Sequence, residues 1–236
     1  MNIGPNGTFR KLKWQTRDTL VSATPDAFTI MGWYLVNASG TSINNYLFAK
    51  MKAVNGRMQL HETNGALRFW LGGGFNGKAG EEFTVSNCMP IGEWTHVALT
   101  KSGGTVKIYV NGELVGENST FTMGLCDANL CVGGFDIGSS SGGFNGAFRN
   151  VGFWSKAMGG SMIKKHMSAL PAFGEASLLG YWPLDDGEGN AVSNLKDGGA
   201  DAVPVGNGFF MWAKGANIIP HIEGTVQPDG TVIIVR

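Results

Sequence analysis

The chain has 236 residues, of which 37 are glycine, and it carries 18 basic and 18 acidic side chains. A length in this range fits one all-β domain with short terminal segments. The formal net charge of zero gives no long-range field, so we expect neither nucleic acid nor a membrane as a partner. Glycine recurs without a fixed period, which excludes collagen and indicates many tight turns between strands.

The three cysteines, Cys88, Cys126 and Cys131, bear on the redox environment. An odd count cannot be fully paired within one chain, although Cys126 and Cys131 could close a small loop. We expect buried thiols in a reducing compartment, and the spacing does not match a zinc site. Residues 1–7 lack the apolar core of a signal peptide, and no apolar run approaches the roughly 18 residues of a transmembrane helix. The sequence thus predicts synthesis and folding in a cytoplasm.

The first half of the chain contains a clear hairpin signal. Residues 28–36 and 46–51 are rich in aromatic and β-branched side chains and are predicted to be strands. Residues 58–71 follow, with Asn64 and Gly65 at the centre of alternating apolar positions. An Asn-Gly pair in this setting is the strongest short-range indication of a β-hairpin with a two-residue turn.

This turn fixes which side chains of the hairpin share a face. One face should be core and carries two opposed pairs, Leu60 with Phe69 and Met58 with Leu71. The other face carries two polar pairs, His61 with Arg68 and Gln59 with Trp70. A tryptophan and an arginine beside a histidine and an amide are unusual for a purely solvated surface.

Further strands and one helix complete the all-β pattern. The expected strands are 94–100, 106–110, 113–115, 130–132 and 147–154, with Asn111-Gly112 as a second hairpin turn. A helix is predicted from Ser161, as its cap, to Leu170, and Pro171 stops it. His166 fits a helix-face residue better than a ligand.

The C-terminal residues predict a small hairpin. Pro228-Asp229-Gly230 is a turn, because proline presets φ and glycine accepts positive φ. The outer strand, 232–235, is too apolar for a free edge, so it either packs onto its own sandwich or adds to a neighbouring subunit. The resulting division is an N-terminal arm (1–13), one domain (14–221) and a C-terminal arm (222–236).

A series of short motifs runs through the second half of the chain. In order these are Trp94-Thr95-His96-Val97-Ala98, Ile108-Tyr109-Val110-Asn111-Gly112, Gly133-Gly134, Phe144-Asn145-Gly146, Val151-Gly152-Phe153-Trp154 and Leu179-Gly180-Tyr181-Trp182-Pro183-Leu184-Asp185. Their order and spacing resemble the concanavalin A-like, laminin-G-like (pentraxin-type) jelly-roll family over roughly residues 28–212. The resemblance implies a two-sheet antiparallel jelly-roll sandwich with one short helix, and a concave face or loop rim that binds ligands.

The resemblance also implies structural roles for several motif residues. Trp94 and Trp154 should be core anchors, and Asn111-Gly112 should be a hairpin turn. A single histidine without a partner constellation is usually packed in its strand, so we expect this of His96.

Glycoside hydrolases of this fold carry three carboxylates on one strand face, and that triplet is absent here. Glycoside hydrolysis needs two carboxyl groups at close, defined separation. Asp186 and Glu188 are flanked by glycines and read as part of a turn, as does Asp185, while Glu113 and Glu117 have Val115 between them. No other catalytic motif occurs. We therefore expect no enzymatic activity, with a hydrolase of the same fold as the less favoured alternative.

Calcium binds many proteins of this family, and it requires six to eight oxygen ligands. The loop candidates in this chain, Asp127, Asp136, Asp185 and Asp186, form no dense cluster in sequence. We assign no metal and no cofactor.

The polar hairpin face is the candidate ligand site. Sugars stack their apolar faces on aromatic rings and accept hydrogen bonds from planar groups at their edges. Trp70 could stack on a ring while Gln59, His61 and Arg68 donate hydrogen bonds. The alternative is that Trp70 packs under a loop or against the C-terminal segment.

These features predict a non-catalytic binding or structural protein. A surface-type fold without an export signal suggests a virion component, decorating a capsid or associated with a fibre, that is assembled in the cytoplasm and exposed after lysis. Its partners would be a glycan or protein surface, capsid or fibre proteins through the terminal arms, and further copies of itself. A secreted carbohydrate-binding module of a larger protein is the alternative.

Overall fold

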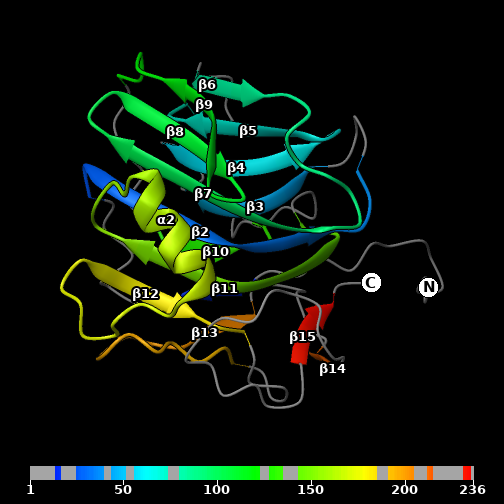
Figure 1. The fold of residues 1–236 in the computed structure, drawn as a ribbon, viewed down its shortest axis with the longest axis vertical. Coiled ribbons are helices and arrows are strands. Elements are labelled where there is room, and N and C mark those ends of the chain that lie inside the picture. Colours follow the sequence, from blue (N-terminus) through cyan, green and yellow to red (C-terminus); the bar gives the residue numbers. More distant parts are fainter. Residues whose placement is uncertain are drawn as a thin grey trace.

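The computed structural model describes residues 14–16, 25–39, 44–51, 56–73, 80–122, 128–134, 143–184, 191–204, 212–214 and 231–234. Within these residues, fifteen strands form two antiparallel sheets and one helix, α2, lies beside them (Figure 1). This arrangement confirms the predicted all-β, two-sheet sandwich with a short helix.

Sheet A has seven strands and sheet B has eight, including one that pairs off the main path. The order in sheet A is β13 (Ala202–Pro204), β1 (Trp14–Thr16), β10 (Leu130–Val132), β3 (Asn45–Met51), β4 (Arg57–Thr63), β5 (Ala66–Leu71) and β6 (Glu81–Val85). The order in sheet B is β14 (Trp212–Lys214), β15 (Thr231–Ile234), β11 (Gly146–Trp154), β2 (Ala27–Val36), β7 (Trp94–Ser102), β8 (Thr105–Val110) and β9 (Glu113–Asn118). β12 (Leu178–Trp182) pairs with β11.

The predicted hairpin is present with the predicted register. Asn64 and Gly65 form the turn between β4 and β5 with φ values of 51° and 77°, so both central residues are in the left-handed region that this turn type requires. Leu60 lies opposite Phe69, and Met58 lies opposite Leu71. All four of these apolar side chains are at most 1% exposed, so the predicted core face is confirmed.

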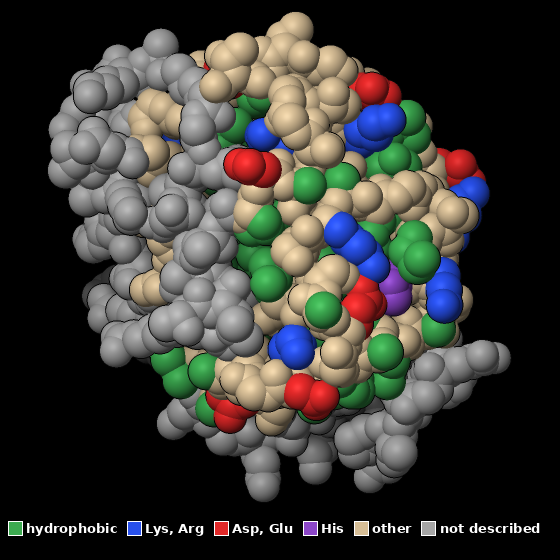
Figure 2. Space-filling model, turned by 90° about the vertical axis from the view of Figure 1, so that its left-hand side faces the viewer, with side chains coloured by type: hydrophobic (Ala, Val, Ile, Leu, Met, Phe, Trp, Pro, Cys, Tyr) green, Lys and Arg blue, Asp and Glu red, His purple; other side chains and the backbone are tan. Residues whose placement is uncertain are grey.

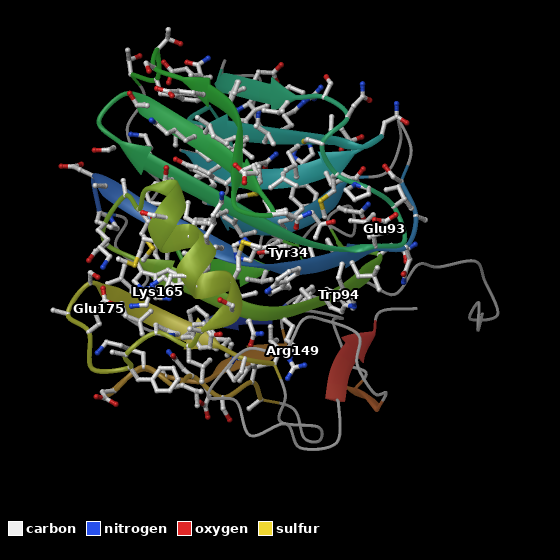
Figure 3. The ribbon with its side chains drawn as sticks, viewed as in Figure 1. Tyr34, Glu93, Trp94, Arg149, Lys165 and Glu175 are labelled. Carbon is white, nitrogen blue, oxygen red and sulfur yellow. The ribbon has the colours of Figure 1, made fainter. Side chains whose placement is uncertain are left out.

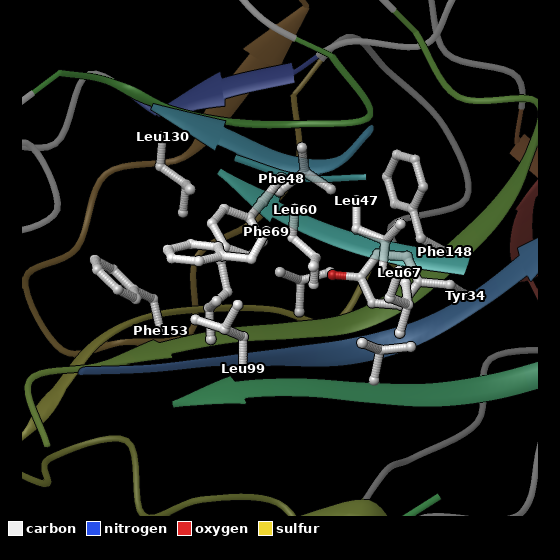
Figure 4. Close-up of a cluster of buried hydrophobic side chains, with 14 of the residues drawn as sticks. Tyr34, Leu47, Phe48, Leu60, Leu67, Phe69, Leu99, Leu130, Phe148 and Phe153 are labelled. Atoms are coloured by element: carbon white, nitrogen blue, oxygen red, sulfur yellow. The ribbon is translucent and has the colours of Figure 1, made fainter. Parts of the chain in front are cut away.

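The main core fills the space between the two sheets. Aromatic and branched side chains from both sheets meet there, as the close-up in Figure 4 shows. Phe48 and Phe69 come from sheet A, and Phe148 and Phe153 from sheet B. Each is at most 1% exposed, and burying a side chain of this size contributes about 1.5–3 kcal/mol relative to leaving it in water.

The helix α2 (Gly160–Ser168) lies on the outer face of sheet B (Figure 1). A second apolar cluster lies beneath this helix. Ile163 of the helix packs there with Met31, Tyr109 and Trp154 of the sheet. The alternation in β8 therefore directs Tyr109 outward, as expected from the sequence, but the helix covers it. Sheet B thus has apolar packing on both of its faces.

The predicted helix cap was wrong by two residues. Gly159 is the N-cap and has no side-chain cap hydrogen bond, whereas Ser161 lies within the first turn. The carbonyl of Gly159 accepts hydrogen bonds from the amides of Met162 and Ile163. The helix therefore begins without the side-chain oxygen that usually satisfies its first amides.

The expectation that Trp94 is a core anchor was also wrong. Trp94 lies half-buried at the start of β7, opposite Leu35, and belongs to neither apolar cluster (Figure 3). Strand alternation explains this, because Val97 faces the main core and even-numbered residues of β7 therefore point outward. Trp154 is fully buried as expected, but in the cluster beneath α2.

The outer strand of the predicted C-terminal hairpin pairs within the same chain. β15 lies between β14 and β11, with Ile233 opposite Phe148 and Ile234 opposite Ala147. Of the two alternatives for this strand, the structure shows the packing onto its own sandwich. The N-terminal arm 1–13 and the turn Pro228-Asp229-Gly230 lie outside the described residues.

A buried carboxylate joins distant segments at one end of the sandwich. Glu62 is 0% exposed and accepts hydrogen bonds from Asn45 Nδ2 at 2.6 Å, from the Gly65 amide at 2.8 Å and from the Ser39 hydroxyl. Asn45 Oδ1 in turn accepts the amide of Asn145 at 2.9 Å. The turn of the β4–β5 hairpin is therefore tied to the segment that begins β11.

The two Asn-Gly turns allow a matched stability test. Alanine at Gly65 or Gly112 must adopt positive φ (77° and 79°), which costs about 1–2 kcal/mol. A Cβ at Gly65 would meet only the Met89 carbonyl at 3.7 Å, whereas one at Gly112 would lie 2.6 Å from Lys164 Cγ of α2. Urea unfolding should therefore show a larger loss of stability for Gly112→Ala than for Gly65→Ala. Equal losses of stability would mean that Lys164 of α2 does not clash with a Cβ at Gly112.

Candidate functional site

The outer face of sheet A carries the polar side chains that the sequence predicts as a ligand site. His61 lies opposite Arg68, and Gln59 lies opposite Trp70, on the adjacent strands β4 and β5. All four point away from the main core, since their neighbours in each strand belong to it. The structure therefore brings the four predicted residues together on one face.

Arg57 extends this group, because it lies two residues before Gln59 on the same face of β4. Its guanidinium carbon is 3.8 Å from the centroid of the Trp70 ring, which is a close cation–π contact. The Trp70 side chain is half-buried. The indole of Trp70 and the guanidinium of Arg57 therefore form one stacked pair on this face.

The position of Trp70 is fixed from a second side by Gly80. A Cβ built on Gly80 would lie 2.0 Å from the indole nitrogen of Trp70 and 2.8 Å from its neighbouring ring carbon. The indole therefore packs directly on the backbone just before β6. This packing agrees in part with the alternative that the sequence left open, in which Trp70 packs under a loop or against the C-terminal segment. The side chain is nevertheless half-buried rather than fully covered.

Gln59 and His61 lie deeper than the sequence suggests. Only 3% of Gln59 and 4% of His61 is exposed, and Gln59 Nε2 lies 3.3 Å from His61 Nδ1. The His61 ring also packs against Tyr46 of β3, with ring centroids 5.4 Å apart. These two predicted donors are therefore almost fully buried, while Arg57, Arg68 and Trp70 form the more exposed part of the face.

Burial and the two arginines both act on the titratable groups of the face. Burial, with smaller contributions from the charges of Arg68 and Arg57, lowers the pKa of His61 to about 4. His61 is therefore neutral at physiological pH. Burial raises the pKa of the Tyr46 phenol, opposed by the charge of Arg57, so this group is also uncharged.

The ion pairs of the described residues lie elsewhere. They join Lys107 to Glu117, Lys156 to Glu175 and Lys164 to Glu113. Within the described part of the chain, neither Arg57 nor Arg68 takes part in an ion pair or a hydrogen bond, and the Nε of each is enclosed without a partner. On the face of the molecule that Figure 2 shows, by contrast with the two unpaired arginines, basic and acidic side chains are interspersed.

The carboxylates considered for catalysis or metal binding form no site among the described residues. Glu113 and Glu117 are exposed on β9, and each is held in one of the ion pairs above. The described residues contain no group of three or more His, Cys, Asp or Glu side chains that could hold a metal. The calcium candidates Asp127, Asp136, Asp185 and Asp186, together with Glu188, lie outside the described residues.

A second group of polar and aromatic side chains lies on the outer face of sheet B, where Trp33 is opposite both His96 and Arg149. Trp33 and His96 pack edge to face with ring centroids 5.4 Å apart. Trp33, His96 and Arg149, the last of which is labelled in Figure 3, are each at most 5% exposed. Burial, with a smaller contribution from His166, lowers the pKa of His96 to about 3. His96 is therefore a packed, neutral residue, as expected from the sequence.

His166 lies where the sequence placed it, on one face of α2. Its ring packs on Trp154 with centroids 5.3 Å apart, and burial lowers its pKa. Cys88 is half-buried with a free thiol, Cys131 is buried in β10, and Cys126 lies outside the described residues. Among the described residues, no helix has the length and hydrophobicity needed to cross a membrane.

Sequence reasoning missed Arg57 and Tyr46 as members of the polar face. The strand was predicted to begin at Met58, one residue too late to include Arg57. The same alternation that placed Gln59 and His61 on this face extends to Arg57. Tyr46 could not be assigned, because a bulge between Tyr46 and Phe48 shifts the register of β3 against β4.

Two apposed antiparallel sheets with a polar outer face define a lectin-type jelly-roll sandwich. The family model of the concanavalin A-like lectin/glucanases superfamily matches residues 7–164. The chain belongs to this superfamily, which confirms the resemblance seen in its motifs. No curated protein sequence matches the chain.

Solved structures share the fold. One is a protein from Bacteroides ovatus described as a candidate carbohydrate-binding protein, with 19% identity and a TM-score of 0.61 over 84% of this chain and 59% of that one. Another is the heptameric SAP-like pentraxin from Limulus polyphemus, with 16% identity and a TM-score of 0.50 over 69% of this chain and 77% of that one. The chain thus spans about three fifths of the Bacteroides ovatus protein. Identities this low show the fold alone.

The low pKa of His61 predicts a stability that depends on pH. The unfolded chain takes up a proton on this residue near pH 6.5, whereas the folded chain does so only near pH 4. The stabilising contribution is therefore complete above about pH 6.5 and is lost as the pH falls toward 4. NMR titration should place the His61 midpoint near 4, and His61→Gln should reduce the slope of unfolding free energy against pH in this window. A midpoint near 6.5 would contradict the buried position of the ring.

Proposed function

We propose that the protein is a non-catalytic, lectin-like module that binds carbohydrate on the outer face of sheet A. The observation that carries this proposal is the contact between Arg57 and Trp70, 3.8 Å from guanidinium carbon to ring centroid, on the more exposed part of that face. Two stacked planar groups offer an apolar surface bordered by hydrogen-bond donors, which is what a pyranose ring requires.

Each residue of the face has a distinct part in this proposal. Trp70 and Arg57 form the platform on which a sugar ring stacks, and Arg68, two residues from Trp70 on β5, donates hydrogen bonds to sugar oxygens. Gln59 and His61 act as positioning residues, because they are almost fully buried opposite Trp70 and Arg68.

The comparisons support a binding role over catalysis. The Bacteroides ovatus protein is described as a candidate carbohydrate-binding protein, and the Limulus protein is a pentraxin. The absence of the hydrolase carboxylate triplet from the sequence points in the same direction.

Removal of the indole should weaken sugar binding. For a ligand selected on a glycan array, Trp70→Ala should raise the dissociation constant measured by calorimetry by roughly tenfold, equivalent to about 1.4 kcal/mol. Trp94→Ala is the matched control, because Trp94 is also half-buried but lies on sheet B. Urea unfolding of both variants checks that the fold is retained. Unchanged affinity in Trp70→Ala would exclude this face as the sugar site.

Displacement of the indole provides a second test that removes no contacting group. Gly80→Ala places a methyl group where the indole nitrogen now lies, so the ring must move. The backbone of Gly80 does not have positive φ, so alanine adds no backbone strain there. Calorimetry should show weaker binding of the same ligand, and urea unfolding measures the cost of moving the ring and of the contact with the Leu71 carbonyl, 3.0 Å from the new Cβ. Full affinity would mean that the present position of the ring is not required.

The finer role, a capsid-decorating or fibre-associated virion protein exposed on the particle surface, is proposed from the sequence alone. It rests on the low charge of the sequence, with residues 1–13 and 222–236 as anchoring arms and 14–221 as the domain. Mass spectrometry of purified particles should detect the chain, and truncation of residues 1–13 should release it into the supernatant after pelleting. Retention of the truncated chain on particles would exclude the N-terminal arm as the anchor.

A further inference from the structure

We propose that the sheet A site selects acidic sugars, those that carry a carboxylate or sulfate group, over neutral ones. This inference rests on the proposed function and names its ligand class. The residues that carry it are Arg57 and Arg68, which flank Trp70 on the outer face.

Among the residues that the structure describes, no carboxylate forms an ion pair with either guanidinium. The lysines Lys107, Lys156 and Lys164 each contact a glutamate, within 3.2 Å for the first pair and closer for the others. Arg57 and Arg68 form no such pair with any described residue, and each has an enclosed Nε without a hydrogen-bond partner. Charged groups that are partly removed from water are normally paired, so an anion is the missing partner.

The strand register places these charges around the indole. Arg68 and Trp70 are two residues apart on β5 and share a face, so their Cα atoms are separated by about 7 Å. Arg57 lies over the ring itself, from the neighbouring strand β4. A sugar ring that stacks on the platform of Trp70 and Arg57 therefore has its substituents within reach of Arg68. The planar guanidinium fork matches a carboxylate or sulfate through two parallel hydrogen bonds.

The described side chains of this face carry more positive than negative charge. Arg68 lies opposite His61 and Arg57 lies on the same strand as His61, and both charges disfavour protonation of the ring. Glu82 of β6, opposite Trp70, acts electrostatically on Arg57 but is exposed and forms no ion pair with it among the described residues. One exposed carboxylate leaves a net positive charge among the described side chains of this face.

The test compares charged ligands with neutral counterparts that have the same sugar backbone. The probes are a galacturonic acid tetramer with its fully methyl-esterified, neutral form, and a sulfated cellotetraose with unmodified cellotetraose. Calorimetry should show at least about tenfold tighter binding for the charged member of a pair, the effect of a hydrogen bond to a charged group. The pair with the larger ratio identifies carboxylate or sulfate as the preferred anion. Higher salt should weaken only the charged ligands.

Matched variants locate the selectivity. Arg68→Gln should reduce the ratio between charged and neutral ligands to near one, and Arg68→Lys should retain part of it, because the charge remains without the fork. Lys107→Gln, which changes net charge equally but lies on sheet B, should leave the ratio unchanged. If Arg68→Gln fails to fold, Arg57→Gln serves as the second variant, with the same expected loss.

The outcomes separate this inference from the proposed function. Equal binding of both members of each pair, or a glycan array on which only neutral glycans bind, would overturn the selectivity and leave the sugar site intact. Binding of no glycan, on the array or in calorimetry, would overturn both. Selectivity that persists in Arg68→Gln and in Arg57→Gln would also overturn the inference.

Discussion

The alternation of side chains along each strand is the constraint on which the whole molecule depends. Once Met58, Leu60, Phe69 and Leu71 are committed to the space between the sheets, their sequence neighbours must point outward. The inner faces of both sheets are thereby used for stability. Any function must then come from the outer faces, from the sheet edges or from the loops.

The two outer faces are treated differently by the fold. Sheet B is covered by α2, whose Ile163 seals a second apolar cluster over Trp154 and Tyr109. Sheet A carries arginine, tryptophan, histidine and glutamine on the strands β4 and β5. The polar group on the outer face of sheet B is almost fully buried, whereas Arg57, Arg68 and Trp70 on sheet A are only half-buried. This difference in exposure sets the position of the candidate site.

Local signals in the sequence predicted the β4–β5 hairpin completely, because an Asn-Gly turn fixes register and register fixes faces. The family resemblance predicted Trp94 as a core residue. Side-chain alternation along β7 instead directs Trp94 outward, because Val97 faces the core. The contact between Arg57 and Trp70 was not predicted, because local sequence patterns define the ends of strands poorly. The predicted strand began at Met58, one residue after Arg57. The start of α2 and its docking depend on packing between distant segments, which no local pattern contains. Neither the depth of Gln59 and His61 nor the bulge in β3 follows from alternation.

The buried junction of Asn45, Glu62 and Asn145 has a consequence for biosynthesis. Its parts are separated by 100 residues, and β2, at the centre of sheet B, needs β11 as one of its two neighbours. A nascent chain that has emerged only as far as β10 therefore exposes an unsatisfied strand edge and an open apolar interior. Such topologies fold slowly and are prone to aggregate while incomplete, so this protein should depend on chaperones or slow translation until the strand after Asn145 leaves the ribosome.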